Sequence, residues 1–172
     1  KGAIIDLEKS AKSLIEAGDF LAEIASQGGN ILWVGNKAEA RLGVKKTAMA
    51  LDMPFVAERW IGGTLTNFSE IRKRVNRLLE IKEEEQKGGL EKYTKKERLV
   101  IDKEKKDLER YFSGIVKMEK KPAVLVLIDS KDEKTAIREA QRLNIPMVAL
   151  ANTDCNIKDI DYPVVGNDYN NK

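Results

Sequence analysis

Short apolar runs alternate with amphipathic segments along most of the chain. The runs lie at residues 3–5, 31–34, 55–57, 124–128, 148–151 and 162–165. Most are apolar throughout, which is typical of strands buried on both faces of a parallel sheet. Apolar stripes at helical spacing lie between them: Leu7, Ala11, Leu14, Gly18, Leu21 and Ala25; Ala40, Val44, Ala48 and Leu51; Ala136, Ala140 and Leu143. The alternation predicts a doubly wound α/β fold.

Residues 67–113 interrupt this alternation. Fourteen Lys or Arg and eleven Asp or Glu make more than half of the segment charged, too much for a core layer. Apolar residues at three-to-four spacing remain: Phe68, Ile71, Val75 and Leu78, then Ile101, Leu108 and Phe112. Lys87-Gly88-Gly89 predicts a turn, and Thr94 with Glu97 a capping box.

Two helices joined by that turn would pack as an antiparallel hairpin. Arms of about 20 residues would project roughly 30 Å from the sheet. Such a pair is either an ordinary solvated element or a device for binding a partner, and its insertion between strands favours the second interpretation. The expected division is therefore a sheet domain of residues 1–66 and 114–172 with a helical insertion at 67–113.

The composition excludes several kinds of catalytic and metal-binding site. The 172 residues contain no His and one Cys, Cys155, which excludes Ser-His-Asp and Cys-His catalysis, His-ligated zinc and an internal disulfide. No apolar run approaches the roughly 20 residues of a membrane span, so a soluble protein is expected. The net charge is only +3, so affinity for a polyanion must come from clustered Lys and Arg.

Such clustering occurs around one glycine pair. The segment from Glu58 to Phe68 reads ERWIGGTLTNF and continues into a helix that carries several cations. Glycines free the backbone for close approach, and guanidinium groups match phosphate oxygens. Trp60 could equally be a core residue or a contact, and only part of the basic helix can face outward. The predicted RNA-binding residues here are Arg59, Trp60, Gly62, Gly63, Thr64, Asn67, Arg72, Lys73, Arg74 and Arg77.

Polar turns at the ends of the predicted strands suggest an alternative. Ligands of open α/β sheets gather at the carboxyl ends of strands. Gly35-Asn36-Lys37 could hold a phosphate, and Asp129, Asp154 and Asp168 could bind a hard cation, although ordinary turns and caps explain them as well. No dinucleotide or P-loop fingerprint is present. The alternative function is therefore a phosphate- or sugar-nucleotide-binding α/β enzyme.

Several motifs resemble one known family. The RW-(aliphatic)-GGTLTNF segment, ILWVGNK at 31–37, LEKYTKKE at 90–97, NIP at 144–146 and IDY with GND at 160–168 are similar, in order, to the bacterial-type second protein of the small ribosomal subunit. Gly35-Asn36-Lys37 departs from the more usual Gly-Thr-Lys of that family. The family's N-terminal helix before Lys1 and C-terminal helix after Asp168 are also expected to be missing.

The resemblance implies a flavodoxin-like (Rossmann-like) parallel sheet flanked by helices, with a protruding helical hairpin. It implies a structural, non-enzymatic role in the small subunit, binding ribosomal RNA at the head-body junction, with no cofactor and no metal. Lys37 joins the expected RNA contacts. The implied partners are neighbouring small-subunit proteins and possibly the large mRNA-binding first protein, on a cytoplasmic or organellar ribosome and not at a membrane.

Overall fold

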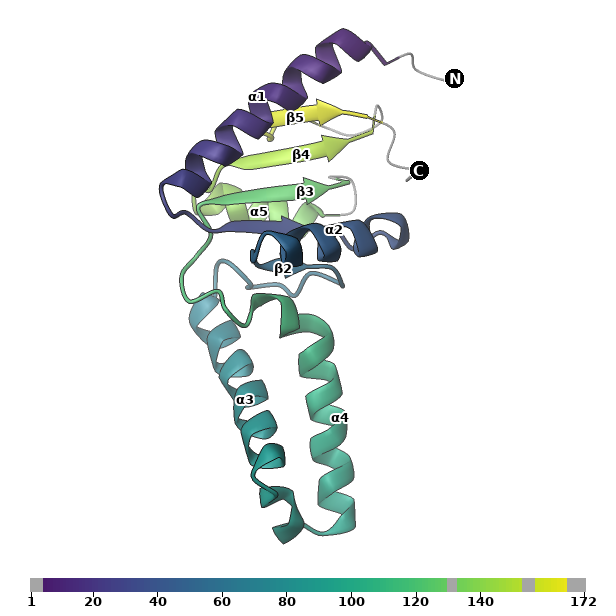
Figure 1. Cartoon of the computed structure of the whole chain (residues 1–172), viewed down its shortest axis with the longest axis vertical. Helices are drawn as coiled ribbons and strands as arrows, with labels where there is room; N and C mark the ends of the chain where they lie inside the picture. Colours follow the sequence, from purple (N-terminus) through teal and green to yellow (C-terminus); the bar gives the residue numbers. More distant parts are fainter. Residues whose placement is uncertain (1–4, 130–132, 153–156, 167–172) are drawn as a thin grey trace.

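The described strands of this protein form one open, parallel sheet. A computed structural model describes residues 5–129, 133–152 and 157–166. Five strands lie in the order β2-β1-β3-β4-β5 (Figure 1). Their bounds are β1 Ile31–Val34, β2 Phe55–Val56, β3 Val124–Ile128, β4 Met147–Ala151 and β5 Tyr162–Val165. Five of the six predicted strands are therefore confirmed; Ile5 is not in a strand, and the rest of the 3–5 run lies outside the described residues.

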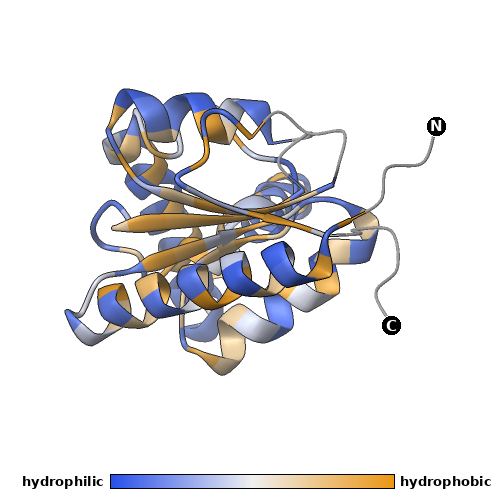
Figure 2. Cartoon of the chain, turned by 90° about the horizontal axis from the view of Figure 1, so that it is seen from above, coloured by the Kyte–Doolittle hydropathy of each residue, from blue (hydrophilic) through white to orange (hydrophobic). Residues whose placement is uncertain are grey.

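Helices cover both faces of this sheet, as the apolar runs predicted. Ala136 and Ala140 of α5 (Lys134–Arg142) pack with Leu125 and Leu127 of β3 on one face. Ala17 of α1 (Leu7–Ser26) belongs to the cluster on the other face. α2 (Ala38–Ala50) lies in front of the sheet and α5 behind it in Figure 1. The view from above shows the apolar strands enclosed between the helices (Figure 2).

The predicted apolar stripe of α1 is confirmed only at Leu21, which packs against the sheet, and is wrong at its other positions. Leu7 and Leu14 are 79% and 61% exposed, whereas Ala17 is buried and Phe20 and Ile24 pack against the sheet. Three-to-four spacing exists on both sides of this helix, so periodicity alone could not select the inward side. Phe20, Leu21 and Ile24 are large side chains in its C-terminal half, and the apolar area that they bury against the sheet favours the observed face.

Two long helices leave the sheet as an arm (Figure 1). They are α3 (Phe68–Gln86) and α4 (Lys95–Phe112), joined by a turn and the 3₁₀ helix η1 (Gly89–Lys92). Gly88 has φ +70°, and Thr94 and Glu97 form the predicted capping box. None of the described helices is long and apolar enough to cross a membrane.

The base of the arm belongs to the core of the sheet domain. Ile71 and Val75 of α3 and Phe112 of α4 are buried in the same cluster as Leu125 of the sheet. The chain then returns through the 3₁₀ helix η2 (Ser113–Ile115), which packs against the edge strand β2. The division at residues 67 and 113 therefore stays a prediction, because the apolar core continues across both points.

Candidate nucleic-acid interface

The turn after β2 is organised around one buried carboxylate. Glu139 of α5 accepts hydrogen bonds from the backbone N–H groups of Gly63 (2.7 Å), Leu65 (2.9 Å) and Thr66 (3.1 Å). The hydroxyl of Thr66 and the indole Nε1 of Trp60 also donate to it, at 3.2 and 3.1 Å. The glycine turn is thus an anion-binding nest, and its anion comes from the chain itself.

Glu139 stays ionised in this position although it is only 6% exposed. Burial by itself would raise its pKa, but the hydrogen bonds from the turn outweigh burial and the pKa is lowered. Because these N–H groups already have an acceptor, they are not available to an RNA phosphate. The glycine turn therefore docks α5 against the base of the arm.

Two predicted contacts in this turn are buried. Trp60 is 7% exposed and belongs to the apolar core, which decides between the two alternatives left open by the sequence. Thr64 is 3% exposed, and its hydroxyl donates to the carbonyl of Ile61 at 2.6 Å. Neither side chain is presented to a partner, so both lose support as RNA contacts. Gly62 and Asn67, in contrast, lie at the exposed surface.

The two glycines of the turn are expected to differ in their tolerance of a side chain. Gly63 has φ +92°, and an added Cβ would lie 3.2 Å from the Cβ of Asn67. Gly62 has a negative φ and open space around it. We expect Gly63→Ala to destabilise by about 1 kcal/mol or more and Gly62→Ala to be close to neutral. Urea melts of the two variants measure this, and equal midpoints would contradict the assignment.

Most of the basic residues on α3 are already engaged. The guanidinium of Arg72 donates to the carbonyls of Val116 and Met118 at 2.9 and 3.2 Å. Lys73 lies 2.6 Å from Glu70. The contacts of Arg72 hold α3 to the segment that follows the arm, whereas Lys73 stays exposed and is partly neutralised by a glutamate of its own helix.

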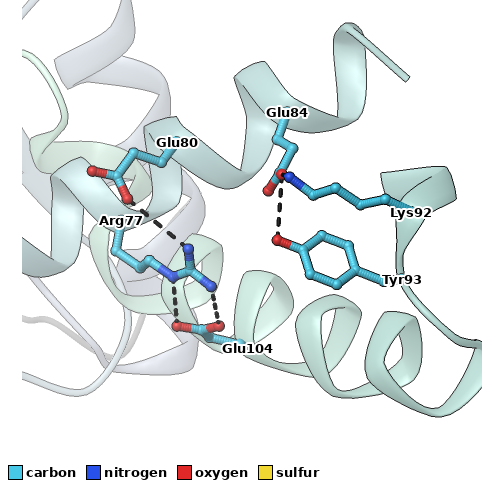
Figure 3. Close-up of polar contacts among 6 residues, drawn as sticks. All are labelled: Arg77, Glu80, Glu84, Lys92, Tyr93 and Glu104. Carbon is cyan, nitrogen blue, oxygen red and sulfur yellow. Dashed lines mark hydrogen bonds and ion pairs between the residues drawn. The ribbon is translucent and has the colours of Figure 1, made fainter. Parts of the chain in front are cut away.

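Arg77 is the most firmly held of these cations. Its Nε and one terminal nitrogen donate to the two carboxylate oxygens of Glu104 on α4, both at 3.1 Å, and Glu80 lies 3.9 Å away (Figure 3). The hydrogen bond to Glu104 raises the pKa of Arg77. The same figure shows Glu84 with Lys92 and the Tyr93 hydroxyl near the tip. Arg77 therefore joins the two helices of the arm.

Two of the predicted cations remain available. Arg59, beside the glycine turn, and Arg74, on α3, are both exposed. Neither forms an ion pair or side-chain hydrogen bond with any residue in the part of the chain that the structure describes. They are the guanidinium groups of the predicted set with the best access to phosphate.

The alternative of an enzyme that binds phosphate at the strand ends loses support, because its predicted phosphate-binding residue is already paired. The ammonium of Lys37 lies 3.1 Å from the carboxylate of Asp129, which follows β3, and both side chains are largely buried. A phosphate at this edge would have to compete with that carboxylate. Asp154 and Asp168 lie outside the described residues, and within those residues no group of His, Cys, Asp or Glu could hold a metal ion. The pairing also removes Lys37 as a free RNA contact.

Glu139 is the residue that the sequence analysis missed. A signal was present, because position 139 lies next to Ala140 and three residues after Ala136 on the stripe predicted to be buried. A charged residue on an apolar stripe requires a partner. Its donors lie 73 to 79 residues earlier in the chain, so the signal could not identify them.

Comparison with known proteins supports the resemblance carried by the motifs. The family described as Ribosomal protein S2 matches residues 1–172. Small ribosomal subunit protein uS2 of Mycobacteroides abscessus is 42% identical over 165 residues, 96% of this chain and 60% of that protein. The uS2 proteins of Mycolicibacterium vanbaalenii and of Mycobacterium sp. strain KMS are also 42% identical over 96% of this chain, and 60% and 58% of their lengths are covered. The chain thus spans about 60% of the curated relatives it matches.

Proposed function

Because the chain belongs to the ribosomal protein S2 family, we propose that it is a structural constituent of the small ribosomal subunit that binds ribosomal RNA. The observation that carries the proposal is the family match over all 172 residues. The role is non-enzymatic and belongs to translation. We place the protein at the head-body junction of a cytoplasmic ribosome, next to other small-subunit proteins and the large mRNA-binding first protein.

The contacts of the described residues favour this function over a phosphate-binding enzyme. The enzyme alternative depends on Lys37, which is paired with Asp129. An RNA-binding role depends on exposed cations without carboxylate partners, and Arg59 and Arg74 fulfil that condition among the described residues. Phosphates of the RNA backbone are the natural ligands of such groups.

We expect the double variant Arg59→Gln/Arg74→Gln to bind small-subunit ribosomal RNA more weakly and with less dependence on salt. Each lost phosphate contact removes about 0.7 to 0.9 from the log-log slope of affinity against salt, so the slope should fall by roughly 1.5. Filter binding of the 172-residue chain to a transcript of small-subunit RNA, from 50 to 300 mM KCl, measures the slope.

The matched control is Lys87→Gln/Lys106→Gln, which removes the same charge from two exposed arm lysines paired with Glu83 and Asp102. Its slope should change by less than half as much. Equal slopes for the two double variants would reject Arg59 and Arg74 as the contacts. A wild-type chain that bound small-subunit and large-subunit RNA equally well would reject the proposed function itself.

A further inference from the structure

A row of cations follows the outer face of α5. Ala136, Glu139 and Ala140 face inward, whereas Lys134, Arg138 and Arg142 are exposed. The three cations are spaced by four residues, so they lie on one side of the helix over about 12 Å. We call Lys134, Arg138 and Arg142 the α5 row.

Unlike several basic residues of the arm, the cations of the α5 row have no acid partner within the described chain. Arg77, Lys82 and Lys105 of the arm each pair with a glutamate of the facing helix. No carboxylate in the described ranges pairs with Lys134, Arg138 or Arg142. Three like charges at successive i, i+4 positions repel one another and destabilise the helix slightly. A bound polyanion would remove this repulsion.

The helix that carries the α5 row is held firmly against the rest of the domain. Glu139 holds the inner side of α5 through the five hydrogen bonds of the glycine turn, and Ala136 and Ala140 are 0% exposed. Trp60 donates to Glu139, and its neighbour Arg59 is exposed. The turn that carries Trp60 and Arg59 is therefore held directly against the inner side of α5.

The side chains on the outer face of α5 indicate which class of partner it binds. Large exposed apolar side chains lie on α1, α2, α3 and α4 in the described chain, for example Leu14, Leu42 and Leu99, but none lies on α5. A protein interface needs an apolar centre that this face does not have. Thr135 and Gln141, which flank the row, are exposed hydrogen-bonding side chains suited to phosphate and sugar oxygens.

We propose that the α5 row is a second contact with the RNA backbone, in which Lys134, Arg138 and Arg142 bind successive phosphates of small-subunit ribosomal RNA and extend the surface begun by Arg59. The inference rests on the proposed function and adds a helix that the sequence analysis did not include. The glycine turn then has a second role, because the hydrogen bonds that hold Glu139 also fix the position of the α5 row.

The test compares two triple variants with the same change in charge. Lys134→Gln/Arg138→Gln/Arg142→Gln removes the row. Lys12→Gln/Lys45→Gln/Lys46→Gln removes three exposed cations of α1 and α2 that likewise have no acid partner among the described residues. α1 packs on the opposite face of the sheet from α5. α2 connects β1 to β2 and so crosses in the opposite direction from α5, which places it on the other face as well (Figure 1).

We expect the row variant to lower the log-log salt slope for a small-subunit RNA transcript by about 2 and the affinity at 100 mM KCl on the order of tenfold. The α1 and α2 variant should change the slope by less than 1. A charge-conserving variant, Lys134→Arg/Arg138→Lys/Arg142→Lys, should keep the wild-type slope. Circular dichroism confirms that each variant has the wild-type helix content before binding is measured.

The outcomes separate this inference from the proposed function. Specific binding by the wild type together with an unchanged slope in the row variant, or equal slopes in both triple variants, overturns the α5 row and leaves the proposed function standing. Loss of affinity in the charge-conserving variant also overturns it, because phosphate contacts depend on charge. A wild type without preference for small-subunit over large-subunit RNA overturns both proposals.

Discussion

Replacing Glu139 by Gln is expected to destabilise the protein by about 2–4 kcal/mol, although the two side chains have nearly the same shape. One carboxylate oxygen accepts from Gly63 N–H and the Trp60 indole, and the other accepts from the N–H of Leu65 and from Thr66. Whichever way the amide of Gln is turned, its NH₂ group faces two or more donors. At least one buried donor, the Trp60 indole or the Leu65 N–H, then remains without an acceptor.

Thermal melts at pH 7 measure this loss, which should lower Tm by roughly 5–12 °C. Glu16→Gln, at an exposed position of α1, is the matched control and should change Tm by less than about 2 °C. A Glu139→Gln variant with a wild-type melting temperature would show that the nest does not depend on the charge of its anion.

The same carboxylate makes stability depend on pH in a definite direction. The pKa of Glu139 is lowered in the folded protein, so its contribution is complete above the unfolded value of about 4.3 and is lost as pH falls through the folded value. We therefore expect the difference in unfolding free energy between the wild type and Glu139→Gln to be constant from pH 6 to 8. It should shrink below roughly pH 4, as measured by urea titration at each pH.

Gly114→Ala should produce an effect of similar size through a different mechanism. A Cβ at position 114 would lie 2.1 Å from the carbonyl oxygen of Phe55 and 2.8 Å from its ring. The oxygen belongs to the backbone of Phe55 in β2, and the carbonyls on either side of it, those of Pro54 and Val56, accept hydrogen bonds from the N–H groups of Trp33 in β1 and of Gly35 just after it. It cannot move without disturbing the sheet, so η2 must separate from the sheet edge. We expect a loss of about 2–4 kcal/mol.

Gly43→Ala supplies the control for this variant. Gly43 lies within α2, and an added Cβ would meet no atom within 4 Å. Alanine there should stabilise the protein by about 0.5–1 kcal/mol, because glycine is a poor helix former. Opposite changes in the midpoint of urea unfolding are therefore expected for two substitutions of identical chemistry. A Gly114→Ala protein with wild-type stability would show that η2 can move away from β2 without a loss of unfolding free energy.

The fold could be predicted largely from the sequence because its determinants are local. The unbroken apolar runs at 31–34 and 124–128 are buried strands, and the capping box of Thr94 and Glu97 begins α4. The burial of Ala40 and Val44 follows their helical spacing. Each of these features involves residues a few positions apart, which the chain brings together whenever it forms a strand or a helix.

The candidate site could be predicted only in part. Its general location, the clustered cations near the glycine pair, stays a prediction, and charge alone did not say which of these cations are free. Arg77 is bound by Glu104, 27 residues later, and Lys37 by Asp129, 92 residues later. Whether a cation is neutralised depends on which acids the fold brings within about 4 Å, and the sequence contains many of both signs.

The sequence by itself determined the strands, the helices, the arm and the family, because periodicity, capping and a long motif are carried by neighbouring residues. Only the tertiary structure decided which side of α1 faces the sheet, which anion fills the glycine turn and which cations stay exposed. Those outcomes depend on contacts such as Glu139 with Gly63, 76 residues apart, whose formation requires the whole sheet to be in place. Packing and charge pairing between distant segments are properties of the assembled fold, and no local pattern specifies them.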